Sequence, residues 1–302
     1  MQKKILIIGG TGFIGYHLAA RCKKLNWEVV SVSTKEPVKN RRLKKVRYKI
    51  CDISIKKNLA KIAKKKYDYV VNLGGYVDHI NKIRTYKAHY LGAQNLFKVF
   101  KNKELKSFIQ IGSSAEYGTA KTPHKENVTG NPGGVYGKSK LLASKFMVNC
   151  YKKYNFPVTI LRFYQLYGPK QNTNRFIPIL IDACLCRKKF VTSSGNQSRD
   201  FLYIDDLVDF VKKAIQKQKT SYEIYNCGSG KPISIKDLCK LVIELSNKNI
   251  KLKFNKSKPT IPFNLYLNCN KAKKELNWAP KTDINFGIRK TIKWWENNIS
   301  GS

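Results

Sequence analysis

Tyr136 and Lys140 have the residue types and the spacing of a proton-transferring pair. They lie four positions apart in a segment with helical periodicity, so both side chains would lie on one face of a helix. A free tyrosine has a pKa of about 10, which is too high for a base at neutral pH. A neighbouring ammonium group and the positive charge of an oxidised nicotinamide both favour phenolate and lower that pKa. The pair predicts acid–base chemistry only in combination with a bound dinucleotide, since Tyr-x-x-x-Lys by itself is common on helix surfaces.

A glycine-rich loop near the start of the chain predicts where that cofactor binds. Gly9, Gly12 and Gly15 follow the apolar run 5–8 and lead into an amphipathic stretch. The first glycine allows a tight turn, the second lets the backbone approach a pyrophosphate, and the third allows close helix packing. The free N–H groups at the start of the following helix attract the phosphates. We therefore predict that this loop binds a dinucleotide.

Alternating strand-like and helical runs must position these residues. The apolar runs rich in β-branched and aromatic residues predict buried strands, and the amphipathic stretches between them predict helices. The strands are expected at 5–8, 29–32, 46–50, 69–73, 108–111 and 158–163, and helices at 13–25, 83–100 and 136–154. This order predicts an α/β fold, a doubly wound parallel (Rossmann) sheet with its chemistry at the carboxyl ends of the strands. The pattern is less regular afterwards, which predicts a dinucleotide-binding domain over 1–169 and a smaller substrate-binding region over 170–302, partly interleaved with the first.

The charge of the chain raises a second class of function. The 302 residues include 59 Lys and Arg against 19 Asp and Glu, for a net charge of +40. Clustered basic residues bind nucleic acids. The lysines here are spread over every predicted helix, and arginine, which suits bidentate contacts, is scarce. We interpret the charge as a lysine-rich surface that favours small anionic substrates, and we expect no specific nucleic-acid partner.

Cysteine usage and hydropathy indicate the compartment. The eight cysteines form no Cys-x-x-Cys pair and no Cys/His spacing typical of a metal site, so we expect free thiols and no metal. The first residues do not have the pattern of a signal peptide, and no apolar run reaches about 18 residues. We therefore expect a cytoplasmic protein with no membrane partner.

Five ordered segments resemble the extended short-chain dehydrogenase/reductases that act on nucleotide sugars. The resemblance covers essentially the whole chain and implies an NAD(P)-dependent enzyme whose C-terminal region binds a nucleotide sugar. The matching segments are the glycine loop with its downstream Tyr-x-x-x-Lys, Asn72–Gly75, Ser113–Gly118, Arg162–Pro169 and Gly195–Asp206.

The resemblance implies a role for each matching residue. Ser113, Tyr136 and Lys140 would be catalytic, with Ser114 as the alternative hydroxyl and with Lys140 also bound to the nicotinamide ribose. Cofactor contacts would come from Tyr136, Lys140, Gly9, Thr11, Gly12, Phe13, Ile14, Ser33, Thr34, Lys35, Asp52, Ile53, Leu73, Gly74, Gly75 and Tyr164. Substrate contacts would come from Ser114, Gln165 and Arg199. Two alternatives stay open: Asp52 could cap a turn, and Arg199 could form a structural ion pair with Asp200 or Asp205.

The end of the second predicted strand bears on the choice of cofactor. A carboxylate there would hydrogen-bond the adenosine ribose and repel a 2′-phosphate. The chain has Ser33, Thr34 and Lys35 at this point, and more cations follow at 39, 41 and 42. Hydroxyls and cations suit a 2′-phosphate. We therefore favour NADP(H), with NAD(H) as the alternative.

The residues after Ser113 bear on the reaction. Relatives that dehydrate nucleotide hexoses carry an acid there, whereas this chain has Ser114 and Ala115. Dehydration would need Glu116 to enter through a shifted loop. We therefore favour NADPH-dependent reduction of the C4 keto group of a 4-keto-6-deoxy sugar nucleotide, with an NAD-dependent 4-epimerase as the alternative. A non-catalytic NADP sensor and a nucleic-acid binder of the same fold are lower alternatives.

The remaining expectations also follow from the resemblance. His89 stands where the family often has Asn, and it would be either a proton donor or a hydrogen-bonded structural residue. Asp78 and His79 could reach the sugar or cap a loop. A second arginine that the family carries near the C-terminus is missing around Phe263, so the contacts with the nucleotide would differ in detail. Helices 83–100 and 136–154 correspond to a dimer interface in relatives, which implies a homodimer.

Overall fold

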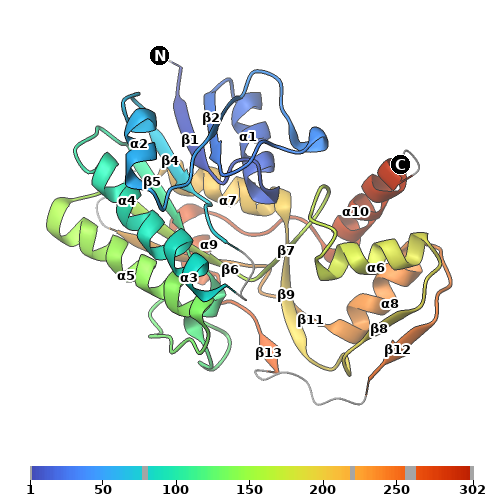
Figure 1. Cartoon of the computed structure of the whole chain (residues 1–302). Coiled ribbons are helices and arrows are strands. Elements are labelled where there is room, and N and C mark those ends of the chain that lie inside the picture. Colours follow the sequence, from blue (N-terminus) through green and yellow to red (C-terminus); the bar gives the residue numbers. More distant parts are fainter. Residues whose placement is uncertain (1, 77–80, 218–221, 256–262, 300–302) are drawn as a thin grey trace.

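A parallel sheet forms the centre of the molecule (Figure 1). The computed structural model describes residues 2–76, 81–217, 222–255 and 263–299. Its seven central strands are β1 (Lys4–Ile8), β2 (Glu28–Ser33), β3 (Arg47–Ile50), β4 (Tyr69–Asn72), β5 (Ser107–Ile111), β6 (Val158–Phe163) and β10 (Glu223–Cys227). They pair in the order β10-β6-β5-β4-β1-β2-β3, and every pairing is parallel.

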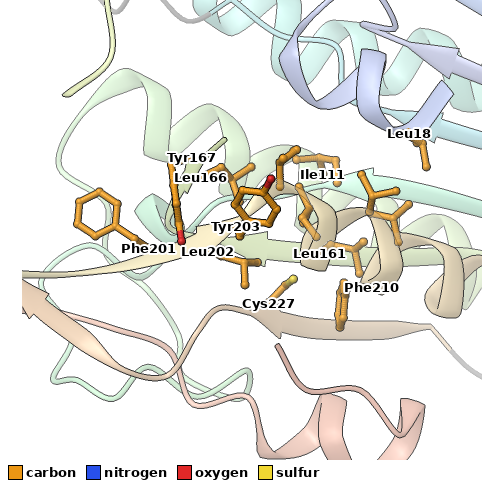
Figure 2. Packing of buried hydrophobic residues seen from close by; sticks show 14 of the residues in the cluster. Leu18, Ile111, Leu161, Leu166, Tyr167, Phe201, Leu202, Tyr203, Phe210 and Cys227 are labelled. Atoms are coloured by element: carbon orange, nitrogen blue, oxygen red, sulfur yellow. The ribbon is translucent and has the colours of Figure 1, made fainter. Parts of the chain in front are cut away.

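Helices cover both faces of this sheet, because successive strand side chains point to opposite sides. Ile5 belongs to one apolar cluster and Leu6 to the other. Figure 2 shows Leu161 of β6 and Phe210 within the first cluster. That cluster includes α1 (Phe13–Lys24) and α7 (Ile204–Gln216), and the second includes α2 (Lys56–Ala63), α4 (Gly92–Phe100) and α5 (Val135–Tyr154). The predicted doubly wound α/β fold is confirmed.

Two predicted elements differ in detail from the sequence pattern. β3 forms at the edge of the sheet, so its Ile50 is 55% exposed rather than buried. The helix expected over 83–100 is divided into α3 (Lys82–Tyr86), a π-helical turn η2 (Lys87–Leu91) and α4. A π turn contains one extra residue, and such turns are frequent at functional sites. Here the turn contains the buried His89.

The C-terminal part adds small sheets and helices beside the main sheet (Figure 1). Strands β7 (Gln165–Tyr167), β9 (Ser198–Tyr203), β11 (Pro232–Ser234) and β13 (Asn264–Leu265) form one sheet, and β8 (Phe190–Thr192) pairs with β12 (Leu252–Phe254). The helices are α6 (Phe176–Leu185), α8 (Ile235–Leu245), α9 (Asn270–Leu276) and α10 (Ile284–Ile299), and short 3₁₀ turns occur at η1 (Lys39–Arg41) and η3 (Ser114–Tyr117). Strand β10, which belongs to this part of the chain, joins the main sheet. The domain boundary expected after residue 169 stays a prediction.

The strand order reverses between β1 and β4, which are neighbours in the sheet. From β1 the chain extends outward to β2 and β3, and from β4 it extends to β5 and β6. Loops that leave such a switch point diverge and create a crevice at the carboxyl ends of the strands. The glycine loop and the segment after β4 both start there. Within the described part of the chain, no helix has the length and apolar content needed to cross a membrane.

Candidate active site

The glycine loop is pressed against both neighbouring strands. Gly9 has a φ of +76°, and its N–H donates to the carbonyl of Val32 at 2.6 Å. A Cβ at Gly9 would lie 2.8 Å from the carbonyl oxygen of Leu73. A Cβ at Gly15 would lie 2.4 Å from the carbonyl oxygen of Gly9. No larger residue fits at these two positions, and the two glycines let α1 begin close to the loop. No side chain caps the first turn of α1. This cradle suits a pyrophosphate.

The end of β2 lies directly beside this loop. The Oγ of Ser33 accepts a hydrogen bond from the N–H of Thr11 at 3.2 Å. Thr34 and Lys35 follow and are exposed. Two cations that the sequence placed near this position are engaged elsewhere: Arg41 donates to the carbonyl of residue 170, and Arg42 pairs with the carboxylate of residue 36. Among the predicted 2′-phosphate contacts, Ser33 therefore touches the glycine loop directly, and Thr34 and Lys35 follow it in the chain.

The predicted cofactor residues Asp52 and Ile53 have structural contacts of their own. One carboxylate oxygen of Asp52 accepts from the N–H of Ser54 at 2.8 Å, which is the turn-capping role weighed from the sequence. Ile53 is buried, and its Cδ1 would lie 3.0 Å from a Cβ at Gly74. Ile53 thus packs beneath the segment that follows β4. The side chain of Asn72 orders this segment by accepting from the N–H of Gly74 at 3.1 Å.

Ser113, Tyr136 and Lys140 come together at the carboxyl end of β5. The side chains of Tyr136 and Ser113 are hydrogen-bonded. Lys140, one helical turn further along α5, is buried and donates to the carbonyl of Ile111 at 2.9 Å. Its Nζ lies 5.9 Å from the centre of the Tyr136 ring. The three predicted catalytic residues therefore form one cluster.

Burial dominates the acid–base properties of this cluster. It raises the pKa of Tyr136 above its ordinary value, while the hydrogen bond from Ser113 lowers the pKa. The charge of Glu116 also raises the pKa of Tyr136, and that of Arg175 lowers it. Burial lowers the pKa of the Lys140 ammonium to about 8. The polypeptide alone thus favours the neutral phenol, contrary to the lowered tyrosine pKa expected from the sequence, because desolvation outweighs the neighbouring groups.

Glu116 positions the Ser113 loop. Its side chain is completely buried, and one carboxylate oxygen accepts from the N–H of Ser113 at 2.8 Å. The other oxygen accepts a hydrogen bond from Nε of the buried Arg162 guanidinium at 3.0 Å and forms an ion pair with its Nη2 at 2.9 Å. The Ser113 Oγ in turn accepts from the N–H of Ala115. Both Glu116 oxygens are therefore occupied inside the protein, which disfavours the shifted loop that dehydration would need.

His89 packs against Tyr136. The two rings are nearly perpendicular, with centroids 5.2 Å apart. His89 is buried, and its Nε2 lies 3.2 Å from the carbonyl oxygen of Tyr76. A Cβ at Gly75 would lie 2.2 Å from the imidazole, so the glycine leaves room for it. This hydrogen-bonded packing fits the structural role for His89. Asp78 and His79 lie outside the described residues.

The predicted substrate residues come from the second region and the Ser113 loop. The half-buried guanidinium of Arg199 donates to the carbonyls of Ser198 and Phe263 at 2.8 and 3.0 Å. Asp200 instead accepts from the 229–230 backbone, and no ion pair of Arg199 occurs within the described ranges. Gln165 is exposed on β7, which pairs with β9.

The other two predicted ligand contacts are at least partly buried. Ser114 is buried beside Ser113 at the start of η3. The hydroxyl of Tyr164 lies 2.5 Å from Nδ1 of His124. Tyr164 thus has a protein partner of its own, in a segment that the sequence did not connect with it.

A cavity of about 450 Å³ opens beside Tyr136. Its lining residues are Lys82, Ala115, Pro132, Gly133, Gly134, Val135, Tyr136 and Gly137. The sequence reasoning did not find Lys82, nor did it find Arg175, whose charge acts on Tyr136. Neither residue belongs to a motif, and each comes near Tyr136 only through the tertiary fold.

The match to a known family agrees with this geometry. The NAD dependent epimerase/dehydratase family matches residues 5–228, which include the glycine loop and the whole Ser113–Tyr136–Lys140 cluster. The chain belongs to the NAD-dependent epimerase/dehydratase family. The resemblance stated from the motifs is thereby confirmed, and the protein is an enzyme of the short-chain dehydrogenase type.

Individual members of the family show its range. An uncharacterised UDP-glucose epimerase of Bacillus subtilis is 28% identical, over 99% of each chain. The dTDP-D-glucose 4,6-dehydratase of Dictyostelium discoideum is 31% identical, over 81% of this chain and 62% of that protein. The structure of UDP-glucuronic acid 4-epimerase from Bacillus cereus, in complex with UDP-glucuronic acid and NAD, is 25% identical, with a TM-score of 0.89 over 97% of this chain and 99% of that one. Relatives with this degree of sequence identity therefore include both epimerases and a dehydratase.

Proposed function

We propose that this enzyme is a nucleotide-sugar 4-epimerase. The observation that carries the proposal is the hydrogen-bonded pair of Tyr136 and Ser113, with Lys140 one turn away, beside the glycine loop. Tyr136 would remove the proton of the C4 hydroxyl and later return a proton to the same oxygen, on a carbon of inverted configuration. Ser113 orients the phenol and the sugar oxygen. A bound nicotinamide dinucleotide would accept the hydride and give it back, and the cradle at Gly9 and Gly15 fits its pyrophosphate.

Two observations support epimerisation within the family. The Bacillus subtilis and Bacillus cereus relatives are both named as epimerases. The carboxylate of Glu116, the nearest acid after Ser113, is engaged with Arg162 and the Ser113 backbone, so it is not free to expel a sugar hydroxyl. Dehydration is therefore less well supported by the site than a reaction that needs only Tyr136.

The second candidate is the reduction that the sequence favours. Its specific support is the end of β2, where Ser33, Thr34 and Lys35 offer hydroxyls and a cation in place of a ribose-binding carboxylate. That arrangement suits NADP(H), a cofactor that reductases consume and release. Burial also favours the protonated form of Tyr136, which is the form that donates a proton to a reduced ketone. The substrate would then be a nucleotide-linked 4-keto-6-deoxy sugar.

One panel of substrates tests both candidates. The purified enzyme is incubated with UDP-linked and dTDP-linked hexoses without added cofactor, and separately with NADPH and 4-keto-6-deoxy sugar nucleotides. In the first arm we expect the C4 epimers to interconvert, as measured by chromatography of the products. Stoichiometric loss of NADPH absorbance in the second arm alone would replace the epimerase by the reductase. Cofactor binding without turnover in either arm would contradict both candidates and favour a non-catalytic sensor.

Substitution of Ser33 by aspartate tests the NADP(H) preference on which the second candidate depends. A carboxylate at the end of β2 would face the 2′-phosphate, and a like-charge contact costs several kcal/mol. We therefore expect the Kd of NADPH to rise about 100-fold, since each 1.4 kcal/mol is tenfold. The Kd of NADH should stay the same or fall, because the carboxylate accepts hydrogen bonds from the ribose. Both constants are measured by the quenching of protein fluorescence.

Ser33→Asn is the matched control, because it has the size of aspartate without the charge. It should change the two dissociation constants to a similar and smaller extent. Equal weakening of both cofactors by the aspartate variant would mean that Ser33 does not face the 2′-position, and the NADP(H) preference would lose its structural support.

We further propose that the enzyme is a homodimer in the cytoplasm. Helices α3 and α5 lie side by side (Figure 1) and expose large apolar residues: Ile83 is 69% exposed, and Leu142 is 41% exposed. A second copy packed on this face would remove both from water. All eight cysteines are free thiols, as is usual in a reducing compartment.

A further inference from the structure

His124 is a completely buried histidine that lies outside all five of the segments that resemble the family. Its Nε2 lies 2.9 Å from the carbonyl oxygen of Ala120, and its Nδ1 lies 2.5 Å from the hydroxyl of Tyr164. Burial lowers the pKa of His124, which favours the neutral ring. A carbonyl oxygen can only accept a hydrogen bond, so Nε2 carries the proton and Nδ1 presents its lone pair. The hydroxyl of Tyr164 therefore donates to His124.

The backbone and the ring of His124 are both held in place. The backbone N–H donates to the carbonyl of Tyr266 at 3.1 Å, and the backbone carbonyl accepts from the side-chain amide of Asn226 at 2.8 Å. The imidazole packs on the rings of Tyr117 and Tyr164, with centroids 4.5 and 5.8 Å away. The imidazole is therefore a fixed acceptor for the Tyr164 hydroxyl.

Tyr164 lies at the same edge of the main sheet as the catalytic cluster. It follows β6 directly, and β6 pairs with β5 so that Leu161 is opposite Ile111. Tyr164 and Ser113 therefore both lie just beyond the ends of these two neighbouring strands. Loops at the carboxyl ends of parallel strands border the crevice in which ligands bind. Unlike His124, Tyr164 is partly exposed.

The position of the glycine loop indicates which end of a dinucleotide would come near Tyr164. The loop follows β1, and the end of β2, at Ser33, is the adenosine side of such a site. The other half of the dinucleotide would then extend in the opposite direction, over the ends of β4, β5 and β6. The hydrogen-bonded pair of Ser113 and Tyr136 lies on this side. Tyr164, at the end of β6, thus belongs to the nicotinamide half of the crevice.

We propose that His124 is a positioning residue, which holds Tyr164 against the nicotinamide half of the bound dinucleotide. This inference rests on the proposed function, because it assumes that the dinucleotide extends from the glycine loop to Tyr136. The hydrogen bond to His124 restricts the rotation of the Tyr164 side chain before the cofactor arrives. A side chain that is already ordered loses less freedom on binding, which strengthens the binding.

Variants of the two partners test this role through cofactor binding. His124→Leu removes the acceptor, and Tyr164→Phe removes only the phenolic oxygen. Each should raise the Kd of NADH or NADPH, whichever the native enzyme binds more tightly, about 10-fold, as the loss of one hydrogen bond permits. The double variant should bind no more weakly than either single one, because both changes remove the same interaction. His124→Asn, whose amide oxygen can accept in place of Nδ1, should bind more tightly than His124→Leu.

Tyr117→Phe is the matched control. It removes another buried hydrogen bond, which the Tyr117 hydroxyl donates to Oδ1 of Asn226 at 2.6 Å, and leaves the acceptor of Tyr164 in place. In urea denaturation it should be destabilised about as much as Tyr164→Phe, since each variant loses one hydrogen bond. Its dinucleotide Kd should stay within about 2-fold of the native value, because the hydrogen bond of Tyr164 is kept.

The outcomes bear separately on the two proposals. Unchanged binding in Tyr164→Phe, additive losses in the double variant, or equal weakening by Tyr117→Phe would overturn the positioning role. If His124→Leu does not fold, the comparison of Tyr164→Phe with Tyr117→Phe decides. Turnover of nucleotide sugars is measured in parallel. If the binding pattern appears in an enzyme that epimerises none of them, the positioning role holds and the proposed reaction is wrong.

Discussion

Replacement of Tyr136 by phenylalanine should lower kcat by about 10³-fold, within the range by which a positioned acid or base accelerates a reaction. The substitution removes only the phenolic oxygen that is hydrogen-bonded to Ser113. The aromatic ring that packs on His89 is kept, so the site should remain folded. The dinucleotide Kd should stay within about 2-fold, because the pyrophosphate cradle lies on other elements. Steady-state turnover and cofactor titration measure the two quantities.

Tyr154→Phe is the control for this experiment, since Tyr154 is exposed at the far end of the same helix. It should leave both turnover and cofactor binding unchanged. Activity of the Tyr136 variant within about 10-fold of the native enzyme would exclude Tyr136 as the principal acid–base group. A parallel loss of cofactor binding would instead assign the tyrosine a binding role.

Substitution of Glu116 by glutamine should lower the free energy of unfolding by about 3–5 kcal/mol, the usual cost of breaking a buried ion pair. The Arg162 side chain is 6% exposed, and the Glu116 carboxylate is its ion-pair partner within the described residues. The variant would leave that charge without a counterion in the interior. Urea denaturation followed by circular dichroism measures the change.

The double variant Glu116→Leu with Arg162→Met shows whether the buried charge is the cause. Apolar residues of similar volume often replace a buried ion pair without loss. We therefore expect the double variant to be more stable than the single one, although its turnover should be below that of the native enzyme because the backbone N–H of Ser113 loses its carboxylate acceptor. If Glu116→Gln lowers the free energy of unfolding by less than about 1 kcal/mol, Arg162 has found another partner.

The sequence predicted the framework of this enzyme well, because the signals concerned are local. Apart from the edge strand β3, the strands of the first half are short, largely apolar runs, and the glycine loop stands between such a run and a helix, so position along the chain specifies position in the fold. Spacing alone also placed Tyr136 and Lys140 on one face of a helix. The interruption of the helix expected over 83–100, at His89, had no signal in the periodicity, since a π turn adds a single residue to an otherwise regular pattern.

The sequence by itself thus determined the fold class and the family, and it singled out Ser113, Tyr136 and Lys140, which the structure brings together. Only the tertiary structure decided their surroundings: that Glu116 is paired with Arg162, 46 positions away, that burial raises the pKa of Tyr136, and that Gly133 and Gly134 border a cavity. The physical reason is that hydrophobic periodicity and backbone preferences act between neighbours in the chain, whereas desolvation, ion pairing and open space depend on segments brought together from distant positions.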